Sequence, residues 1–448
     1  MNNNMNISRR KFIGTAAATG SLAYLGGAPF AFAGKDPKKL RFAQIGCGGR
    51  GTAHHGMWRK HQLVAAVDTN RKAVDMFSAT AMPDLKRYSD YRKMYENHMD
   101  GIDAVIVATP DHHHYSAAML ALLGGKAVFC EKPLAWSINE CLSLARIVKE
   151  RQLPSQMGNQ GNGMRGWRDV YAIVHQDIIG NVKEVHTWTN RPIWPQGIET
   201  PADGEPVPDG LDWETWIGPA PMRAYRKEIQ PFTWRGFRDF GSGALGDMAC
   251  HTMNAMFQVM KPEFDCSVEV LRIEGPSSYQ FPKKEIIKWS FAKLGDCPGF
   301  DAFWYDGDLK PEKPAAMGSN NLPGKGVMFV GSKGVLISVG DYNEGNVVYI
   351  DGQKVEPKFE QMIKPSEGGM YGEFLAAAAG EKPWNSPMSN FMYAGKMTAI
   401  IGMGIIASKL GVGRKITFSA AAMKFDNDEA NQLMGRKPRD GWEKAYRI

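Results

Sequence analysis

Four short, almost uninterrupted apolar runs in the first third of the chain restrict the possible folds more than any other feature. They are residues 40–45 (LRFAQI), 63–67 (LVAAV), 104–108 (AVIVA) and 127–129 (AVF). Such runs lack the polar alternation of half-exposed strands and are typical of strands buried on both faces of a parallel sheet. Residues 115–123 form a helical stretch closed by two glycines, and a capping box at Ser137 to Glu140 opens another helix. This alternation predicts a doubly wound α/β domain over residues 38–156.

The rest of the chain, residues 157–448, differs in composition and in hydrophobic pattern, and it predicts a second, α+β domain. Glycine, proline and tryptophan become frequent, and residues 182–189 (VKEVHTWT) alternate like a half-solvated antiparallel strand. The Pro- and Gly-rich stretch 192–221 is long for a connection, so we expect it to cover a site or a partner chain. Helical patterns occupy residues 371–379 and 388–408.

The first 33 residues resemble an export signal rather than part of a domain. Arg9, Arg10 and Lys11 precede a mildly apolar run, and Ala31 and Ala33 frame a small-x-small cleavage pattern. The segment is similar to a twin-arginine signal, whose pathway carries folded proteins, and it predicts a periplasmic location. The apolar run is too short and too rich in glycine to predict a stable membrane span.

Composition narrows the possible partners. The 448-residue chain is 43% hydrophobic and 23% charged, as ordinary globular proteins are. Its net charge of +7 includes three charges from the signal-like segment, and the remainder is too mild to predict binding to nucleic acid or to a membrane surface. Six cysteines could pair in an exported protein, but most are better interpreted as small buried residues, since three lie inside the motifs below.

A glycine-rich loop follows the first apolar run. It reads G-x-G-x-x-G and consists of Gly46, Cys47, Gly48, Gly49, Arg50 and Gly51. A helix-compatible run, residues 52–60, follows it, and in this context such glycines let the backbone approach a pyrophosphate at a helix N-terminus. Asp68 ends the next apolar run, where an acid bonds ribose hydroxyls and would repel a 2′-phosphate. The loop therefore predicts a dinucleotide site that prefers NAD to NADP.

Two further motifs lie where apolar runs end, at the sheet edge where ligands bind in such folds. One is Thr109-Pro110-Asp111 followed by three histidines, residues 112–114. Consecutive helical residues point about 100° apart, so we expect no metal there; one or two rings should line the cofactor pocket, the alternative being that they face solvent. The other is Glu131-Lys132-Pro133, where Lys132 could orient a substrate hydroxyl and share its proton, the alternative being a surface ion pair.

Residues 243–260 predict one helix that carries an acid and a histidine one turn apart. Asp247 and His251 share a face with Asn254. A carboxylate beside an imidazole suits a general base acting on a hydroxyl, because the acid orients the ring and stabilises its charged form. The spacing of four residues is equally consistent with a surface ion pair or with half of a metal site, so both stay open as alternatives.

Taken in order, IGCGGRG, VDTN, ATPDHHH, CEKP and GDMACH resemble the Gfo/Idh/MocA superfamily of sugar and polyol oxidoreductases over nearly the whole chain. The resemblance implies a Rossmann domain followed by an open, mainly antiparallel sheet that supports dimers or tetramers. It implies that Lys132, Asp247 and His251 are catalytic and contact the reacting carbinol, and that His114 lies near the nicotinamide.

The same resemblance completes the set of candidate pocket residues. With the glycine loop and Asp68, the cofactor-binding candidates are Thr109, Pro110, His114, Glu131, Lys132 and Gln160. Arg165 and Trp167 lie in a segment similar to exported bacterial members and are substrate-binding candidates. Trp234 joins them, because its flat face suits a sugar ring and core packing is the alternative.

Three functions are consistent with these residues. The first is an oxidoreductase that removes hydride from a secondary hydroxyl of a sugar, polyol or glycoside and holds NAD tightly. The second is a redox-neutral glycosidase or epimerase that oxidises, eliminates and returns the hydride. The third is a non-catalytic sugar-binding protein. Export favours a retained cofactor, since little free NAD is expected outside the cytoplasm to reoxidise a reduced one.

Overall fold

The computed structural model describes residues 39–78, 82, 84–199 and 203–446. The export signal predicted for residues 1–33 lies outside the described residues.

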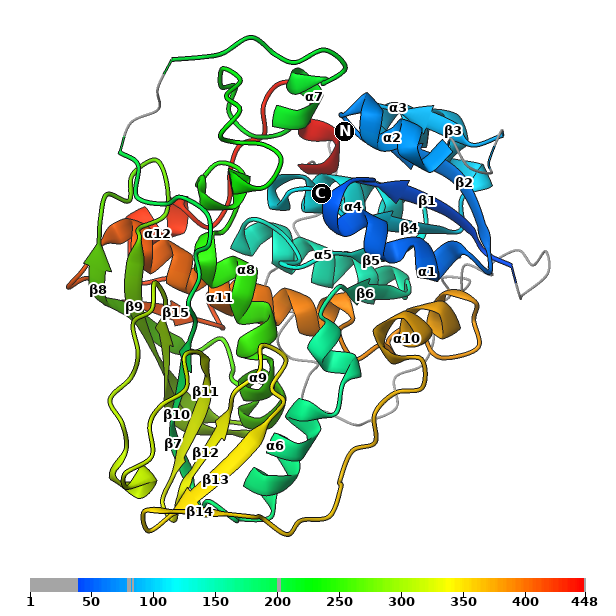
Figure 1. Ribbon diagram of the computed structural model, residues 1–448. Helices are drawn as coiled ribbons and strands as arrows, with labels where there is room; N and C mark the ends of the chain where they lie inside the picture. The colour runs from blue at the N-terminus through cyan, green and yellow to red at the C-terminus, as the bar shows by residue number, and fades with distance from the viewer. Residues whose placement is uncertain (1–38, 79–81, 83, 200–202, 447–448) are drawn as a thin grey trace, which may run out of the picture.

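The first domain is built on a six-stranded parallel sheet (Figure 1). Its strands are β1 (Arg41–Ile45), β2 (Gln62–Val67), β3 (Lys86–Tyr88), β4 (Ala104–Val107), β5 (Ala127–Cys130) and β6 (Ser155–Met157). The order β3-β2-β1-β4-β5-β6, with every described pairing parallel, is that of a doubly wound sheet with a switch point between β1 and β4. Strands β4 and β5 are buried throughout, which explains why their runs show no alternation. The predicted α/β domain is confirmed.

Helices cover both faces of this sheet. They are α1 (His55–Trp58), α2 (Arg71–Ser78), α3 (Tyr91–His98), α4 (Asp111–Leu123) and α5 (Ile138–Arg151). Ser137 and Glu140 form the predicted capping box at the start of α5. The helix-compatible run 52–60 is helical over most of its length, but as a 3-10 turn, Gly49–His54, followed by the short α1. Gly51 N donates to Gly48 O at 2.9 Å, a tight i to i+3 closure, because this loop must turn sharply beside β1.

The second domain holds a ten-stranded sheet. Its strands are β7 (Val182–Trp188), β8 (Cys266–Glu274), β9 (Lys284–Leu294), β10 (Cys297–Tyr305), β11 (Gly326–Gly331), β12 (Val335–Ser338), β13 (Asn346–Ile350), β14 (Gln353–Val355), β15 (Ile416–Ser419) and β16 (Lys424–Phe425). The order is β14-β13-β12-β11-β7-β10-β9-β8-β15-β16, and among the described pairings only β7 with β10 is parallel. The predicted, mainly antiparallel α+β domain is confirmed.

The second domain also carries helices, the longest of which packs between its sheet and the first domain (Figure 1). They are α6 (Gly166–His175), α7 (Trp213–Ile217), α8 (Gly243–Thr252), α9 (Asn254–Met260), α10 (Gly369–Ala378), α11 (Phe391–Leu410) and α12 (Asp428–Gln432). The 20-residue α11 is long and apolar enough to cross a membrane, but 72% of its apolar window is buried. It packs along α5, α8 and strands β8 and β9, so its composition is that of a core helix.

The single helix predicted over residues 243–260 is wrong, because the ladder breaks at Met253 between α8 and α9. Asn343, fully buried in a distant loop, inserts its side-chain amide at the break. Its Nδ2 donates to Thr252 O at 2.8 Å, and its Oδ1 accepts from Ala255 N at 3.1 Å. The inserted amide satisfies the backbone groups that the break leaves free.

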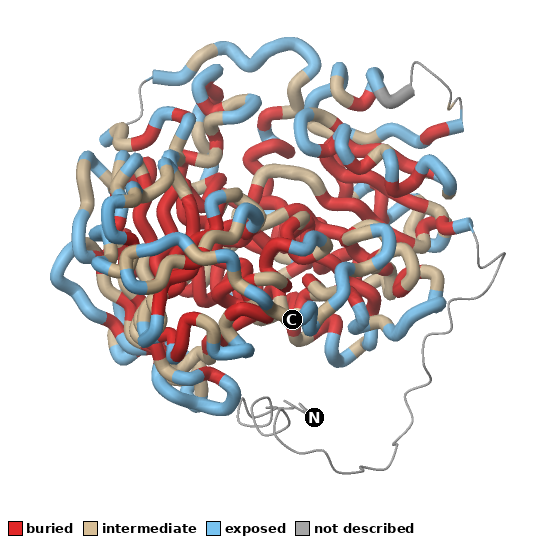
Figure 2. Tube along the Cα trace, turned by 60° about the horizontal axis from the view of Figure 1, so that its bottom comes forward, coloured by how far each residue is buried: buried red, intermediate tan, exposed pale blue. Residues whose placement is uncertain are grey.

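One apolar core runs through both domains, and a C-terminal arm joins them again. Figure 2 shows buried chain through the interior and exposed chain in the outer loops. After α12, residues 433–446, which we call the C-terminal arm, return to the first domain. Arg436 ion-pairs with Glu140 of α5, and Tyr115 of α4 donates to Ala445 O at 3.1 Å.

Candidate active site

A cavity of about 530 Å³ lies at the carboxyl edge of the parallel sheet. Its walls come from the loops after β1, β2, β4 and β5, from residues 215–235, and from α8. This is the edge at which ligands bind in open α/β sheets, and it lies at the switch point of the strand order. We call it the main cavity.

The glycine loop forms one wall of the main cavity, and its backbone needs glycine. Gly46 has φ +86°, and a Cβ there would lie 2.4 Å from Ala108 O of the neighbouring strand end. A Cβ on Gly51 would lie 2.3 Å from Gly46 O. Gly46, Gly48, Gly49 and Arg50 line the cavity, whereas Cys47 is buried behind it with Sγ 3.5 Å from Val67 O. The loop leaves a backbone cradle that side chains would fill.

Asp68 directly follows β2 and holds the glycine loop in place. Its Oδ2 accepts from Cys47 N at 2.8 Å and from Gly48 N at 3.4 Å, and its Oδ1 accepts from Asn70 N at 2.8 Å. Burial raises the pKa of the Asp68 carboxyl, and these hydrogen bonds oppose the rise. The carboxylate lines the main cavity, where a ribose hydroxyl could use its remaining lone pairs.

The loop after β4, which forms part of the cavity wall, contains a polar atom that a ligand could bond. Thr109 and Pro110 line the main cavity, and Thr109 Oγ1 is buried without a hydrogen-bond partner. Buried hydroxyls without a partner are uncommon. With the glycine cradle and Asp68, this orphaned hydroxyl fits a bound dinucleotide, so the residues present suit NAD.

The first two histidines of the triple run bond one carbonyl rather than a metal. His112 Nε2 and His113 Nε2 each lie 2.8 Å from Trp216 O, on a segment that covers the main cavity. His113 lines the cavity, and its Nδ1 lies 3.1 Å from Tyr91 Oη. Burial lowers the pKa of His113 to about 3, so its ring is neutral near pH 7. Within the described residues, no group of three His, Cys, Asp or Glu side chains could hold a metal ion.

His114 lies beside the main cavity rather than in its wall. Its Nδ1 is 2.7 Å from Pro133 O, and its Nε2 is 2.9 Å from Thr109 O. These carbonyls belong to the loops after β5 and β4. The ring therefore ties the two loops together, and the nicotinamide contact implied by the resemblance stays a prediction.

Glu131 lines the main cavity, and its buried carboxylate lies between Arg50 and His54. Arg50 Nε donates to its Oε1 at 2.9 Å, and His54 Nε2 lies 3.0 Å from the same oxygen. Burial alone would raise the pKa of Glu131, but the His54 contact and the Arg50 charge lower it to about 2. A Cβ on Gly158 would lie 2.7 Å from this carboxyl group. The amide of Gln160, oriented with its oxygen toward Arg50, accepts from Nη2 at 2.8 Å, outside the cavity wall.

Lys132 and Asp247 form a buried ion pair in the wall of the main cavity. Lys132 Nζ lies 2.7 Å from Asp247 Oδ1 and 2.9 Å from Asp247 O. Burial alone would lower the pKa of Lys132, but the Asp247 charge and hydrogen bond raise it. Burial would likewise raise the pKa of Asp247, whereas Lys132 and Arg235 lower it to about 2. The pair is therefore an ammonium and a carboxylate at neutral pH.

His251 is not bonded to Asp247, contrary to the predicted acid–imidazole pair. Asp247 instead accepts from Lys132 and from Arg235, whose Nε is 3.2 Å from Oδ1. A buried carboxylate is stabilised more by two cations than by a neutral ring. Burial, followed by the Lys132 charge, lowers the pKa of His251 to about 3. Its Nδ1 is buried without a partner, and its ring packs edge-on against Tyr342 at 5.1 Å.

The three remaining substrate-binding candidates lie in different places. Trp234 lines the main cavity. Trp167 is fully buried in the core and donates from Nε1 to Asn162 O at 3.2 Å. Arg165 is exposed at the surface, 3.0 Å from Asp169. Neither Trp167 nor Arg165 lines the cavity, so the geometry does not support their predicted role.

Sequence reasoning missed several cavity residues from the Pro- and Gly-rich stretch and the segment after it. They are Thr215, Trp216, Gln230, Pro231, Phe232 and Arg235. The expectation that residues 192–221 cover a site was the only signal. No motif or period marked individual residues in it.

Residues 208–219, which we call the strap, lie beside the loop after Asp68, and Thr215 and Trp216 of this segment line the main cavity. At one end, Arg71 N donates to Gly210 O and Asp212 N donates to Thr69 O, both at 2.9 Å. At the other end, Arg439 of the C-terminal arm donates to Gly218 O at 3.0 Å from Nε. The strap thus bridges the loop after Asp68 and the C-terminal arm.

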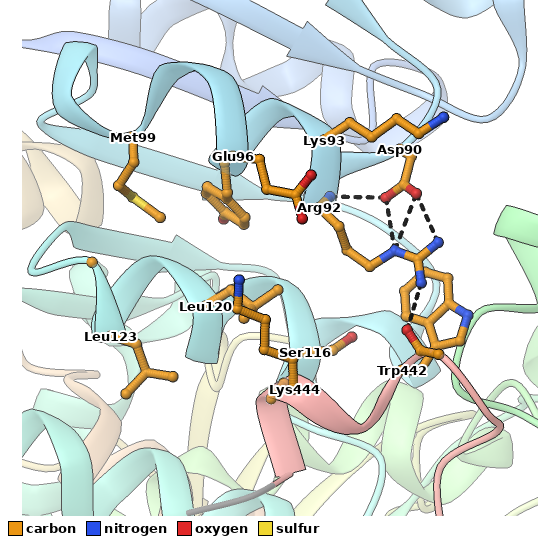
Figure 3. Close-up of a pocket in the computed structure, with 14 residues that line it drawn as sticks. Asp90, Arg92, Lys93, Glu96, Met99, Ser116, Leu120, Leu123, Trp442 and Lys444 are labelled. Atoms are coloured by element: carbon orange, nitrogen blue, oxygen red, sulfur yellow. Dashed lines mark hydrogen bonds and ion pairs between the residues drawn. The ribbon is translucent and has the colours of Figure 1, made fainter.

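A second cavity, of about 520 Å³, lies between α3, α4 and the C-terminal arm (Figure 3). Arg92 and Asp90 form an ion pair at one end, where Arg92 lies 3.8 Å from the ring centre of Trp442. Ser116, in its wall, lies with Oγ 2.5 Å from Tyr91 Oη. Because Tyr91 also contacts His113 of the main cavity, a hydrogen-bonded wall separates the two cavities.

The chain matches two family models in succession. Residues 40–159 match an oxidoreductase family with an NAD-binding Rossmann fold, and residues 172–281 match the C-terminal alpha/beta domain of that family.

Curated relatives and solved structures agree with these matches. A 2,7-anhydro-N-acetylneuraminate hydratase of Escherichia coli is 32% identical over 94 residues, which are 20% of this chain and 25% of that protein. A glycosyl hydrolase family 109 protein of Shewanella pealeana is 26% identical over 208 residues, 40% of this chain and 45% of that protein. The chain thus spans between a quarter and about half of the length of such relatives.

Among solved structures, the WlbA dehydrogenase from Bordetella pertussis, in complex with NADH and UDP-GlcNAcA, superposes with a TM-score of 0.59. It shares 18% identity, and the alignment covers 85% of this chain and 99% of that one, which shows the same fold. The chain belongs to the Gfo/Idh/MocA oxidoreductase family, with an NAD-binding Rossmann domain followed by the C-terminal domain of that family.

Proposed function

We propose that this protein oxidises a secondary hydroxyl of a sugar, polyol or glycoside by hydride transfer to an NAD that it retains. The observation that carries the proposal is the Lys132–Asp247 ion pair, which lies in the wall of the same cavity as the glycine loop and Asp68. NAD, when bound, accepts the hydride that leaves the substrate carbon.

Lys132, Asp247 and His251 have separate roles around the substrate hydroxyl. Lys132 is an ammonium that Asp247 holds from two sides, through its carboxylate and its carbonyl. Its remaining N–H can donate to the hydroxyl oxygen and stabilise the negative charge that grows there as the hydroxyl proton leaves, before the departing hydride converts the alkoxide into a carbonyl. His251 lies one turn along α8 from Asp247, outside the residues that line the cavity, and its Nδ1 has no partner among the described residues; it is the group that we propose accepts the hydroxyl proton.

A redox-neutral glycosidase or epimerase is the second candidate, and the strap favours it. A covered cofactor that stays bound must be restored in each turnover. Returning the hydride to the substrate after elimination or inversion does this without a second redox partner. Similarity to a glycosyl hydrolase family 109 protein and to an anhydrosugar hydratase supports this candidate.

Export from the cytoplasm would explain why the protein retains its cofactor. We propose that residues 1–33 direct the folded, NAD-loaded protein to the periplasm through the twin-arginine pathway. There the protein would act on carbohydrate as a dimer or tetramer. Periplasmic fractionation, with Arg9→Lys/Arg10→Lys as the blocked variant, tests the location.

The test begins with the purified full chain and no added nucleotide. Denaturation should release stoichiometric NAD. The protein is then given free sugars and chromogenic glycosides. NADH that accumulates with free sugars supports the net oxidoreductase, whereas sustained chromophore release without NADH supports the redox-neutral cycle.

Variants test the roles of the residues. Lys132→Ala and His251→Ala should abolish both signals and keep the bound NAD. Lys261→Ala is the matched control, since Lys261 forms a similar pair with Asp296, 2.8 Å apart, at the surface. A protein that neither contains nor binds NAD overturns the proposal. Unchanged signals in both variants overturn the roles of the two residues, whereas NAD-loaded wild type that gives neither signal leaves the non-catalytic sugar-binding function.

A further inference from the structure

Arg235 is a cation in the main cavity without a carboxylate of its own. Three arginine or lysine side chains line this cavity: Arg50, Lys132 and Arg235. Arg50 pairs with Glu131, and Lys132 pairs with Asp247. Arg235 only shares Asp247, through Nε at 3.2 Å.

The other acids in the cavity wall do not compensate Arg235 by direct contact. Asp68 is bonded to the glycine loop at the ribose side. Asp111 accepts from Ser242 Oγ at 2.6 Å, and burial raises its pKa. The charges of Arg235 and Lys132 reach Asp111 and oppose this rise in its pKa, but among the described residues Asp247 is the carboxylate in direct contact with both cations.

The guanidinium of Arg235 is fixed in direction. Its Nη1 donates to Phe232 O at 3.1 Å, and its central carbon lies 4.3 Å from the ring centre of Trp234 and 4.6 Å from that of Phe232. Its side chain keeps 20% of its surface exposed, and no described residue bonds to its Nη2. With Nε and Nη1 each donating one hydrogen bond, both hydrogens of Nη2 and the second hydrogen of Nη1 remain for a ligand, and arginine N–H groups of this kind bind oxyanions.

We propose that Arg235 anchors an oxyanion substituent, a carboxylate or a phosphate, of the sugar whose hydroxyl faces Lys132. The substrates are then acidic sugars rather than neutral ones. This inference rests on the proposed function and names its substrate class. The shared Asp247 couples the anchor to the reacting group, because the same carboxylate oxygen holds both cations.

Calorimetric binding to the NAD-loaded full chain tests the anchor without turnover. The probes are matched pairs: D-glucuronate with D-glucuronamide, D-galacturonate with D-galacturonamide, and glucose 6-phosphate and galactose 6-phosphate with their parent hexoses. At least one acid should bind with a Kd ten times or more below that of its neutral partner. The uronates and the phosphates separate the two kinds of oxyanion. No preference in any pair, including no binding of any acid, overturns the inference.

Two substitutions assign the preference to Arg235. Arg235→Gln should remove the acid preference, and Arg235→Lys should keep part of it because the charge stays but the fork is lost. Arg223→Gln is the matched control: Arg223 pairs with Asp239 and lies 4.8 Å from the ring centre of Tyr279, but it does not line the cavity. A preference that survives Arg235→Gln overturns the anchor. The NAD content of each variant is measured separately, so a failure of the proposed function appears as lost nucleotide or absent oxidation of every sugar.

Discussion

Gly46→Ala and Gly49→Ala should differ in their effect on stability, although both glycines lie in the same loop with positive φ. Gly46 has φ +86° and Gly49 has φ +51°. An alanine in this region of backbone space costs about 1–2 kcal/mol, so this contribution is similar at both positions. The difference arises from what the new methyl group meets.

At Gly46 the methyl carbon would lie 2.4 Å from Ala108 O and 2.6 Å from Ala108 C, whereas at Gly49 nothing lies within 4 Å. The obstacle at Gly46 is backbone at the end of β4, which Ala108 N fixes by donating to Ile45 O at 2.8 Å. Relieving such an overlap costs about 1–3 kcal/mol. We therefore expect Gly46→Ala to lower the free energy of unfolding by about 2–5 kcal/mol and Gly49→Ala by about 1–2 kcal/mol.

Urea unfolding followed by tryptophan fluorescence measures both values, and it is carried out on the nucleotide-free protein so that lost binding does not add to the difference. The expected gap between the two variants is about 1–3 kcal/mol. Equal destabilisation would refute the reasoning, since it would mean that the ends of β1 and β4 are not packed as closely as the Gly46 contact requires.

Three further outcomes follow from the same contacts. The folded protein lowers the pKa of Glu131 from 4.5 to about 2, so the charged Glu131 stabilises the fold fully above about pH 5 and this stabilisation is lost toward pH 2. Between pH 5 and pH 2 the free energy of unfolding of the wild type should therefore fall by about 3 kcal/mol more than that of Glu131→Gln. Urea unfolding at each pH measures both values. Arg439→Ala removes one anchor of the strap and should release bound NAD about ten to a hundred times faster, followed by transfer of the nucleotide to a scavenging dehydrogenase. Asp247→Asn leaves burial to lower the pKa of Lys132, so the alkaline limb of kcat/KM should move to lower pH; an unmoved limb would show that Lys132 does not act as an ammonium.

Most strands of the parallel sheet could be predicted, because a strand that is buried on both faces usually appears in the sequence as an apolar run. The exceptions are β3 (Lys86–Tyr88), an edge strand whose first two residues are exposed, and β6 (Ser155–Met157), which is buried but contains Ser155 and Gln156, so neither has an apolar run to detect. The ten-stranded sheet could be predicted only as a type. Its strand β7 lies between β10 and β11, which come more than a hundred residues later, and no local pattern encodes pairing at that distance.

The active-site residues likewise fall into those that could be predicted from the sequence and those that could not. Asp68, Thr109 and Lys132 were predictable, because a residue that ends a buried parallel strand is carried by the fold to the ligand edge. The partner of Asp247 was not, because a spacing of four residues says only that two side chains share a face. Which group reaches a buried carboxylate depends on charge, and the lysine and arginine that do so come from residues 132 and 235 of other elements.

The strap determines how long a bound NAD would stay, more than the glycine loop does. Both the loop and Asp68 line one side of the main cavity, and contacts there set affinity without closing the exit. The strap is fastened to the loop after Asp68 by Gly210 and Asp212, to α4 through Trp216 O, and to the C-terminal arm through Arg439. At about 1 kcal/mol net for each hydrogen bond, detaching it costs roughly 5 kcal/mol, which slows an exit that requires opening by about a thousandfold or more. A nucleotide held on that time scale would stay with the protein over many turnovers, which is the retained NAD that we propose.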